Sequence, residues 1–144
     1  MMEHGARLKA MCCPVGNTNH GNGARNLEHR PLAGLDALVV EDEFLIAQIL
    51  CDDLGLLGAT IIGPFSRIAP AMERIASGES LQAAILDINV AGEEVYPLAD
   101  ELVKLGVKVV FLTGYTRVKL PARFASYPVF SKNAPIEELV TALT

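Results

Sequence analysis

The stretch Ala83-Ala84-Ile85-Leu86-Asp87 is a short apolar run that stops at an acid, and three further runs in the chain also stop at a polar residue. Glu41-Asp42 follows residues 37–40, Thr113 follows residues 109–112, and Lys132 follows residues 129–131. Apolar runs of this length are typical of parallel strands buried on both faces. The carboxyl ends of such strands lie side by side and form the binding crevice of an open α/β sheet. We therefore expect these polar side chains to meet at one edge, where carboxylates, a hydroxyl and an ammonium group suit Mg²⁺ and a phosphoryl group.

From residue 35 onward, short apolar runs alternate with segments of helical period, which predicts a βα repeat and a parallel sheet. Strands are expected at residues 38–40, 60–63, 81–86, 107–112 and 128–130. Helices are expected at residues 44–54, 68–76, 94–105 and 135–143, with a short one within residues 115–127, where Pro121 interrupts the pattern. The first helix is predicted to turn an apolar stripe toward the core: Phe44, Leu45, Ala47, Ile49, Leu50 and Leu54. The sequence thus predicts one α/β domain with five parallel strands and about five helices.

The composition fits a single soluble domain with a disordered leader. The 144 residues are 51% hydrophobic, yet no apolar run is long enough to cross a membrane. The net charge of −5 argues against a nucleic-acid surface, which is normally basic. The first 30 residues lack apolar periodicity and the apolar stretch of a signal peptide. We expect residues 1–33 to be a disordered extension and residues 34–144 to be the folded domain. The cysteines fit no zinc spacing, so free thiols in a reducing cytoplasm are expected.

Four elements of the chain resemble the receiver domain of two-component response regulators, over about residues 35–144. They are Val39-Val40-Glu41-Asp42-Glu43, Ile85-Leu86-Asp87-Ile88-Asn89, Phe111-Leu112-Thr113-Gly114-Tyr115 and Phe130-Ser131-Lys132. The Thr-Gly-Tyr sequence after the fourth strand resembles the variant found in single-domain regulators of alphaproteobacteria. The resemblance implies a flavodoxin-like three-layer sandwich, with a five-stranded parallel sheet in the order 2-1-3-4-5.

The resemblance also implies roles for residues at the predicted sheet edge. Asp87 would be the phosphoacceptor, a carboxylate nucleophile that takes a phosphoryl group from a phosphohistidine of a sensor histidine kinase. Mg²⁺ would be held by Glu41, Asp42, Asp87 and the main-chain carbonyl of Asn89. Lys132 would pair with the phosphoryl oxygens as a point charge.

A second group of residues would carry the switch. The resemblance implies that Thr113 moves its hydroxyl toward the phosphate and that Gly114 leaves the following loop flexible. Val129 stands where many receivers have a rotating aromatic residue, so Tyr115 is the candidate for that role. Most receivers also have a proline, joined by a cis peptide, at the position of Asn133. A cis bond before a non-proline residue is costly, so we expect a trans peptide there.

The function favoured by these residues is a stand-alone phosphoacceptor rather than an enzyme. Its partners would be a sensor histidine kinase and a downstream protein, without nucleic acid or membrane, and it would act in the cytoplasm as a monomer or weak dimer. One alternative is a receiver-like binding module that is never phosphorylated. Another is a phosphatase with an aspartyl-phosphate intermediate, but such enzymes typically have a second acid two residues after the nucleophile, where this chain has Asn89. A flavin-binding module is less favoured because no Ser/Thr/Gly-rich loop follows the first strand.

Overall fold

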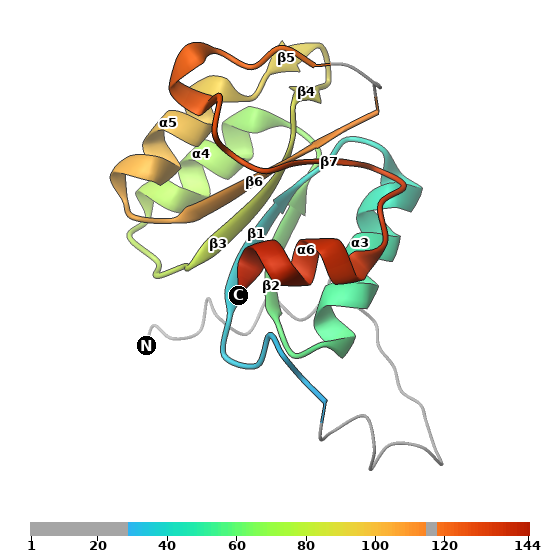
Figure 1. The fold of residues 1–144 in the computed structure, drawn as a ribbon. Helices are drawn as coiled ribbons and strands as arrows, with labels where there is room; N and C mark the ends of the chain where they lie inside the picture. Colours follow the sequence, from blue (N-terminus) through green and yellow to red (C-terminus); the bar gives the residue numbers. More distant parts are fainter. Residues whose placement is uncertain (1–28, 115–117) are drawn as a thin grey trace.

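Five parallel strands form the central sheet of the computed structural model, which describes residues 29–114 and 118–144 (Figure 1). In spatial order they are β2 (Thr60–Phe65), β1 (Asp36–Val40), β3 (Ala83–Asp87), β6 (Lys108–Thr113) and β7 (Val129–Ser131). Counted along the chain within this sheet, the order is 2-1-3-4-5, which confirms the predicted flavodoxin-like topology. Every neighbouring pair is parallel, so the carboxyl ends of all five strands share one edge.

Four α-helices of the described residues cover the two faces of this sheet. One face carries α4 (Ile68–Ala76) and α5 (Tyr96–Lys104), and the other carries α3 (Phe44–Leu56) and α6 (Ile136–Leu143) (Figure 1). Successive side chains of β1 alternate between the two cores, because Leu38 and Val40 pack with α4 and α5 whereas Val39 packs with α3 and α6. All five residues of β3 are buried, as expected for a central strand covered on both sides.

The buried face of α3 differs from the predicted one. The structure buries four of its residues at helical spacing: Ala47, Leu50, Cys51 and Leu54. Phe44, Leu45 and Ile49, which we predicted to face the core, are instead 76%, 71% and 60% exposed. This part of the prediction is wrong because α3 is apolar around most of its circumference. Periodicity alone cannot select the buried face of such a helix.

The short helix expected between β6 and β7 is a 3-10 helix in the described part of that segment. This element, η2 (Ala122–Phe124), begins directly after Pro121 and is the only helical element in those described residues. The ring centroid of Phe124 lies 5.4 Å from that of Phe111 and 5.2 Å from that of Tyr127. Edge-to-face packing of buried rings at these spacings is favourable, so it anchors η2 to the core. Residues 115–117, including Tyr115, lie outside the described residues.

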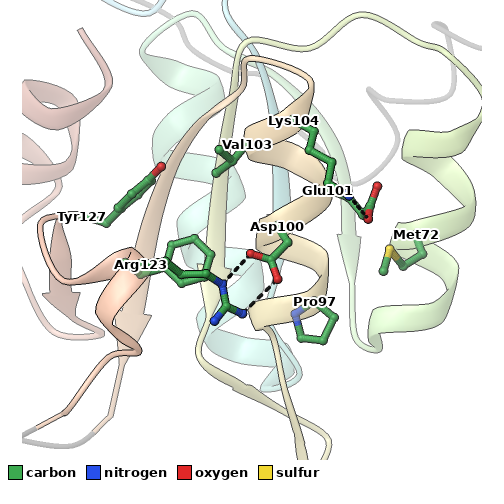
Figure 2. Close-up of a pocket in the computed structure, with 9 residues that line it drawn as sticks. Met72, Pro97, Asp100, Glu101, Val103, Lys104, Arg123 and Tyr127 are labelled. Carbon is green, nitrogen blue, oxygen red and sulfur yellow. Dashed lines mark hydrogen bonds and ion pairs between the residues drawn. The ribbon is translucent and has the colours of Figure 1, made fainter.

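Arg123 ties η2 to α5 from the outside. Its Nε and Nη2 donate to the two carboxylate oxygens of Asp100 at 2.8 and 2.9 Å (Figure 2). Its guanidinium carbon lies 4.9 Å from the ring centroid of Phe124, a cation–π distance. Figure 2 shows this pair beside Met72 and Pro97 in a hollow between α4, α5 and η2. None of the residues predicted for the functional site is among the lining residues of this hollow.

Strand β2 is longer than predicted. It continues through Pro64 to Phe65 instead of ending at Gly63, because an edge strand tolerates a residue that donates no ladder hydrogen bond. The only cis peptide among the described residues joins Gly63 to Pro64. The peptide before Asn133 is therefore trans, which confirms the expectation for that position.

Near the start of the described residues, Leu32 packs against the folded domain. Leu32 is buried, and its N–H donates to the carbonyl oxygen of Leu57 at 2.9 Å. Leu32 thus fills space beside the end of α3. Within the described residues, no helix is both long and apolar enough to span a bilayer.

Two leucines of α3 test the corrected orientation of this helix. Leu54 is fully buried and Leu56 is largely exposed. Leu54→Ala should lower the free energy of unfolding by about 2–5 kcal/mol, because it leaves a cavity in the core. The matched change Leu56→Ala should alter it by roughly 0.5 kcal/mol or less. Urea unfolding followed by circular dichroism measures both, and similar losses in the two variants would contradict the orientation.

Candidate functional site

Three carboxylates converge at the carboxyl edge of the sheet. Glu41 and Asp42 directly follow β1, and Asp87 is the last residue of β3, the neighbouring strand. One carboxylate oxygen from each of the three lies within 4.8 Å of the others. Glu41 and Asp87 are buried, whereas Asp42 is exposed. The topology brings these acids together because parallel neighbours end at the same edge.

Lys132 reaches this cluster from the end of β7, the edge strand opposite β2. Its backbone N–H donates to the carbonyl oxygen of Thr113 at 3.0 Å, which continues the β6–β7 pairing past the end of β7. Its Nζ then lies 3.0 Å from Oε2 of Glu41 and 3.0 Å from Oδ2 of Asp87. The structure thus joins the lysine after the last strand to acids from the first and third strands of the sheet.

Glu43 contributes a third carboxylate that forms an ion pair with the Lys132 ammonium group. Its Oε1 lies 3.1 Å from Nζ of Lys132. Sequence reasoning included Glu43 in the motif after the first strand but assigned it no role. Its position directly after the two predicted acids was the available signal. Spacing alone does not show that its side chain turns toward the lysine.

A short hairpin missed by the sequence analysis supports Asp42. It consists of β4 (Asn89–Val90) and β5 (Glu93–Glu94), which pair in antiparallel fashion. The two connecting residues, Ala91 and Gly92, both have positive φ, 52° and 85°, as in the tight turns preferred by hairpins. The N–H of Ala91 donates to Oδ2 of Asp42 at 2.8 Å. The usual sequence signal for such a turn, Asn-Gly or Asp-Gly, is absent here.

The other predicted site residues that the structure describes are Asn89, Thr113 and Gly114. The N–H of Asn89 donates to Oδ1 of Asp87 at 3.4 Å, so the backbone turns sharply after β3. Thr113 is buried at the end of β6, and Gly114 is exposed directly after it. Tyr115 lies outside the described residues, so its predicted switch role stays a prediction.

Burial and charge shift the protonation equilibria of the cluster. Burial raises the pKa of Glu41 to about 7, although the N–H of Glu43 and the ammonium of Lys132 act in the opposite direction. Burial likewise raises the pKa of Asp87, against the lowering effect of Lys132. Burial opposes the charge of Lys132 too, but the surrounding carboxylates prevail and raise the pKa of that ammonium. Three carboxylates thus share the single ammonium group of Lys132, and Asp42 adds a fourth acid to the cluster.

Asp42 differs from its two buried neighbours. Partial burial raises its pKa, but the hydrogen bond from the Ala91 N–H and further bonds outweigh this effect. The net pKa of Asp42 lies below its ordinary value, so this carboxylate is ionised at neutral pH.

The cluster has the features of a divalent-cation site. Oε1 of Glu41 is buried without a hydrogen-bond partner among the described residues. A buried polar atom without a partner is unfavourable and points to a bound water or ion. Hard cations take oxygen ligands from carboxylates and backbone carbonyls, and the three acids supply such oxygens. The donor set therefore fits a divalent cation at this edge.

The fold and parts of the sequence are shared with solved structures. SdrG from Sphingomonas melonis Fr1 is 34% identical, with a TM-score of 0.66, over 76% of this chain and 92% of that one. The BeF3-activated conformation of SdrG from Pseudomonas melonis Fr1 is 36% identical, with a TM-score of 0.66, over 77% and 97%. The response regulator protein TrrA from Thermotoga maritima, in complex with Mg²⁺-BeF, shares the fold at 23% identity and a TM-score of 0.63, over 76% and 99%. No protein-family model and no curated protein matches the chain.

The raised pKa of Glu41 predicts a pH-dependent stability in the presence of a chelator. Glu41 binds its proton more tightly in the folded state, with a pKa near 7, than at its ordinary value of 4.5. The resulting stabilisation is complete below about pH 4.5 and is lost as the pH rises through about 7. The melting temperature of the wild type in EDTA should therefore fall between pH 5 and pH 8 more steeply than that of Glu41→Gln. Each kcal/mol lost corresponds to roughly 4 °C in a domain of this size.

The control for that comparison is Glu73→Gln, which removes an exposed carboxylate from α4. It should keep the pH dependence of the wild type. Parallel melting curves for the wild type and Glu41→Gln across this pH range would contradict the assignment.

Proposed function

Because this chain belongs to the response regulator receiver domain family, we propose that its Asp87 accepts a phosphoryl group from a sensor histidine kinase. The observation that carries the proposal is the environment of Asp87, a buried carboxylate with the Lys132 ammonium at 3.0 Å and two further acids beside it. A buried carboxylate at the end of a central strand is costly unless it is used. It lies at the carboxyl edge of a parallel sheet, where open α/β sheets bind their ligands.

The proposed step is a displacement at phosphorus. A carboxylate oxygen of Asp87 attacks the phosphorus, and a new O–P bond forms while the P–N bond of the phosphohistidine breaks. The electron pair of the broken bond returns to the imidazole nitrogen of the kinase. Lys132 donates N–H to the phosphoryl oxygens and offsets part of their charge. We propose no further enzymatic activity, apart from hydrolysis of the phosphoaspartate in the same site.

Charge balance explains why the step needs a cation. Two carboxylates about 4 Å apart repel each other by roughly 4 kcal/mol at an effective dielectric constant near 20. Phosphorylation adds negative charge to this cluster. In our proposal Glu41, Asp42, Asp87 and the main-chain carbonyl of Asn89 hold Mg²⁺. The bound ion supplies the positive charge that Lys132 alone cannot supply.

The conformational change caused by phosphorylation would spread from the site through the end of β6 to the elements that follow it. We propose that the hydroxyl of Thr113 turns toward the phosphoryl group and that Gly114 lets the following backbone adjust. An added Cβ at Gly114 would meet no atom within 4 Å, so space permits such an adjustment. Tyr115 would follow this movement as the switching aromatic residue. The output would be a changed affinity for a downstream protein in the cytoplasm, with the domain acting as a monomer or weak dimer.

Intact-mass measurement tests the phosphoacceptor role. The wild-type protein, incubated with Mg²⁺ and acetyl phosphate, should gain the mass of one phosphoryl group. Asp87→Ala should gain none, because its methyl group has no nucleophilic oxygen. Asp52→Ala, which removes an acid from the middle of α3 away from the cluster, is the matched control and should behave like the wild type. Equal labelling of Asp87→Ala would refute the assignment, and absence of labelling in the wild type would favour an unphosphorylated binding module.

Thermal unfolding tests the proposed Mg²⁺ site. At a Mg²⁺ concentration about ten times the dissociation constant, binding to the folded state adds roughly 1.4 kcal/mol. The melting temperature should then rise by about 5 °C. Asp42→Asn should lose most of this rise, because it removes an ionised ligand, whereas Glu73→Gln should keep it. A wild-type melting curve unchanged by millimolar Mg²⁺ would argue against the site.

A further inference from the structure

All three ammonium protons of Lys132 are already engaged before any phosphoryl group arrives. An ammonium group has three N–H donors. Nζ lies 3.0 Å from Oε2 of Glu41, 3.1 Å from Oε1 of Glu43 and 3.0 Å from Oδ2 of Asp87. The oxygens of a phosphoryl group on Asp87 would require the same donors. Phosphorylation consumes the charge of the Asp87 carboxylate, so the bond from Nζ to Asp87 is lost first, and any further phosphoryl oxygen that accepts from Lys132 must displace Glu41 or Glu43.

Burial decides which carboxylate can release it at least cost. Of the two glutamates, Glu41 is buried, and a buried carboxylate that loses a cation partner is strongly destabilised. The side chain of Glu43 is 59% exposed. Water can therefore solvate its carboxylate as soon as the ion pair opens. Glu43 is the partner whose contact with Lys132 is easiest to break.

The start of α3 holds Glu43 in this position. Glu43 is the N-cap residue of α3, with extended backbone angles (φ −89°, ψ 114°), and its side chain makes no capping hydrogen bond. Its N–H donates to Oε2 of Glu41 at 2.9 Å, the same oxygen that accepts from Lys132. Residues favoured at this position cap the helix with a short side chain. The longer glutamate extends past the helix end and reaches the lysine instead.

We propose that Glu43 is a positioning residue that holds Lys132 in the unphosphorylated site and releases it to the phosphoryl oxygens. This inference rests on the proposed function of Asp87. With acetyl phosphate as donor, an Asp87 oxygen bonds to phosphorus, the P–O bond to the acetyl group breaks, and acetate leaves with the electron pair. During this step an N–H of Lys132 moves from Glu43 to a phosphoryl oxygen. Because the Glu43 contact exists only before transfer, it slows phosphorylation and leaves hydrolysis of the phosphoaspartate unchanged.

Two substitutions of Glu43 separate the contact from the charge. Glu43→Gln removes the charge, whereas Glu43→Asp keeps a carboxylate but shortens the side chain by one methylene. An aspartate at the N-cap is expected to turn toward the helix N–H groups and so leave the lysine. We expect both variants to be phosphorylated by acetyl phosphate about two- to fivefold faster than the wild type, the factor that corresponds to an exposed ion pair. Both should lose the phosphoryl group at the wild-type rate.

A matched control excludes a general effect of charge. Glu93→Gln removes an exposed carboxylate from the hairpin that carries Ala91, but Glu93 makes no ion pair with Lys132. We expect it to be phosphorylated at the wild-type rate. Nuclear magnetic resonance of the Lys132 ammonium provides a second readout, in which its protons should exchange faster with water in Glu43→Gln and Glu43→Asp than in the wild type before any phosphodonor is added.

The outcomes separate this inference from the function it rests on. If the wild type is never phosphorylated, the proposed function fails and this inference fails with it. If the wild type is phosphorylated but Glu43→Asp retains the wild-type rate and ammonium exchange, the positioning role alone is refuted. Equal acceleration by Glu93→Gln, or a hydrolysis rate that changes in parallel with phosphorylation, would also refute it.

Discussion

The ion pairs of one ammonium group hold the functional edge of this domain together. Nζ of Lys132 joins Glu41, which follows β1, to Asp87, which ends β3. Two buried carboxylates beside each other would be strongly unfavourable without a cation. Breaking a buried ion pair costs several times more than breaking an exposed one. The sheet provides the convergence, because its strands are parallel and share an edge. The charge of Lys132 offsets part of the repulsion between the carboxylates that this edge brings together.

Most of the fold follows from simple features of the sequence. The five strands are mostly apolar between their ends, and turn residues separate them from the helices, so the strand number and the α/β class are predictable. The face of α3 is not predictable in this way, because Phe44 and Ile49 are as apolar as Leu50. Only the position of the helix against the sheet decides which of them is buried. Pro121 correctly marks a break in the segment after β6, but the extent of η2 depends on how Phe124 packs.

The site was predictable to the extent that it depends on topology. Polar residues at the ends of parallel strands must lie near one another, and Glu41, Asp87 and Lys132 do so. Contacts that depend on local backbone geometry were missed. The bond from the Ala91 N–H to Asp42 requires a tight turn without the usual turn residues, and the reach of Glu43 requires the particular start of α3.

The outward apolar side of α3 has an energetic consequence. Phe44, Leu45 and Ile49 remain in water in the folded domain, and a surface that covered them fully would gain roughly 3–6 kcal/mol in total. The loss of translational and rotational freedom on association is of similar size or larger. Contacts through these three side chains alone would therefore form and dissolve quickly, and a long-lived complex would require additional area elsewhere on the domain.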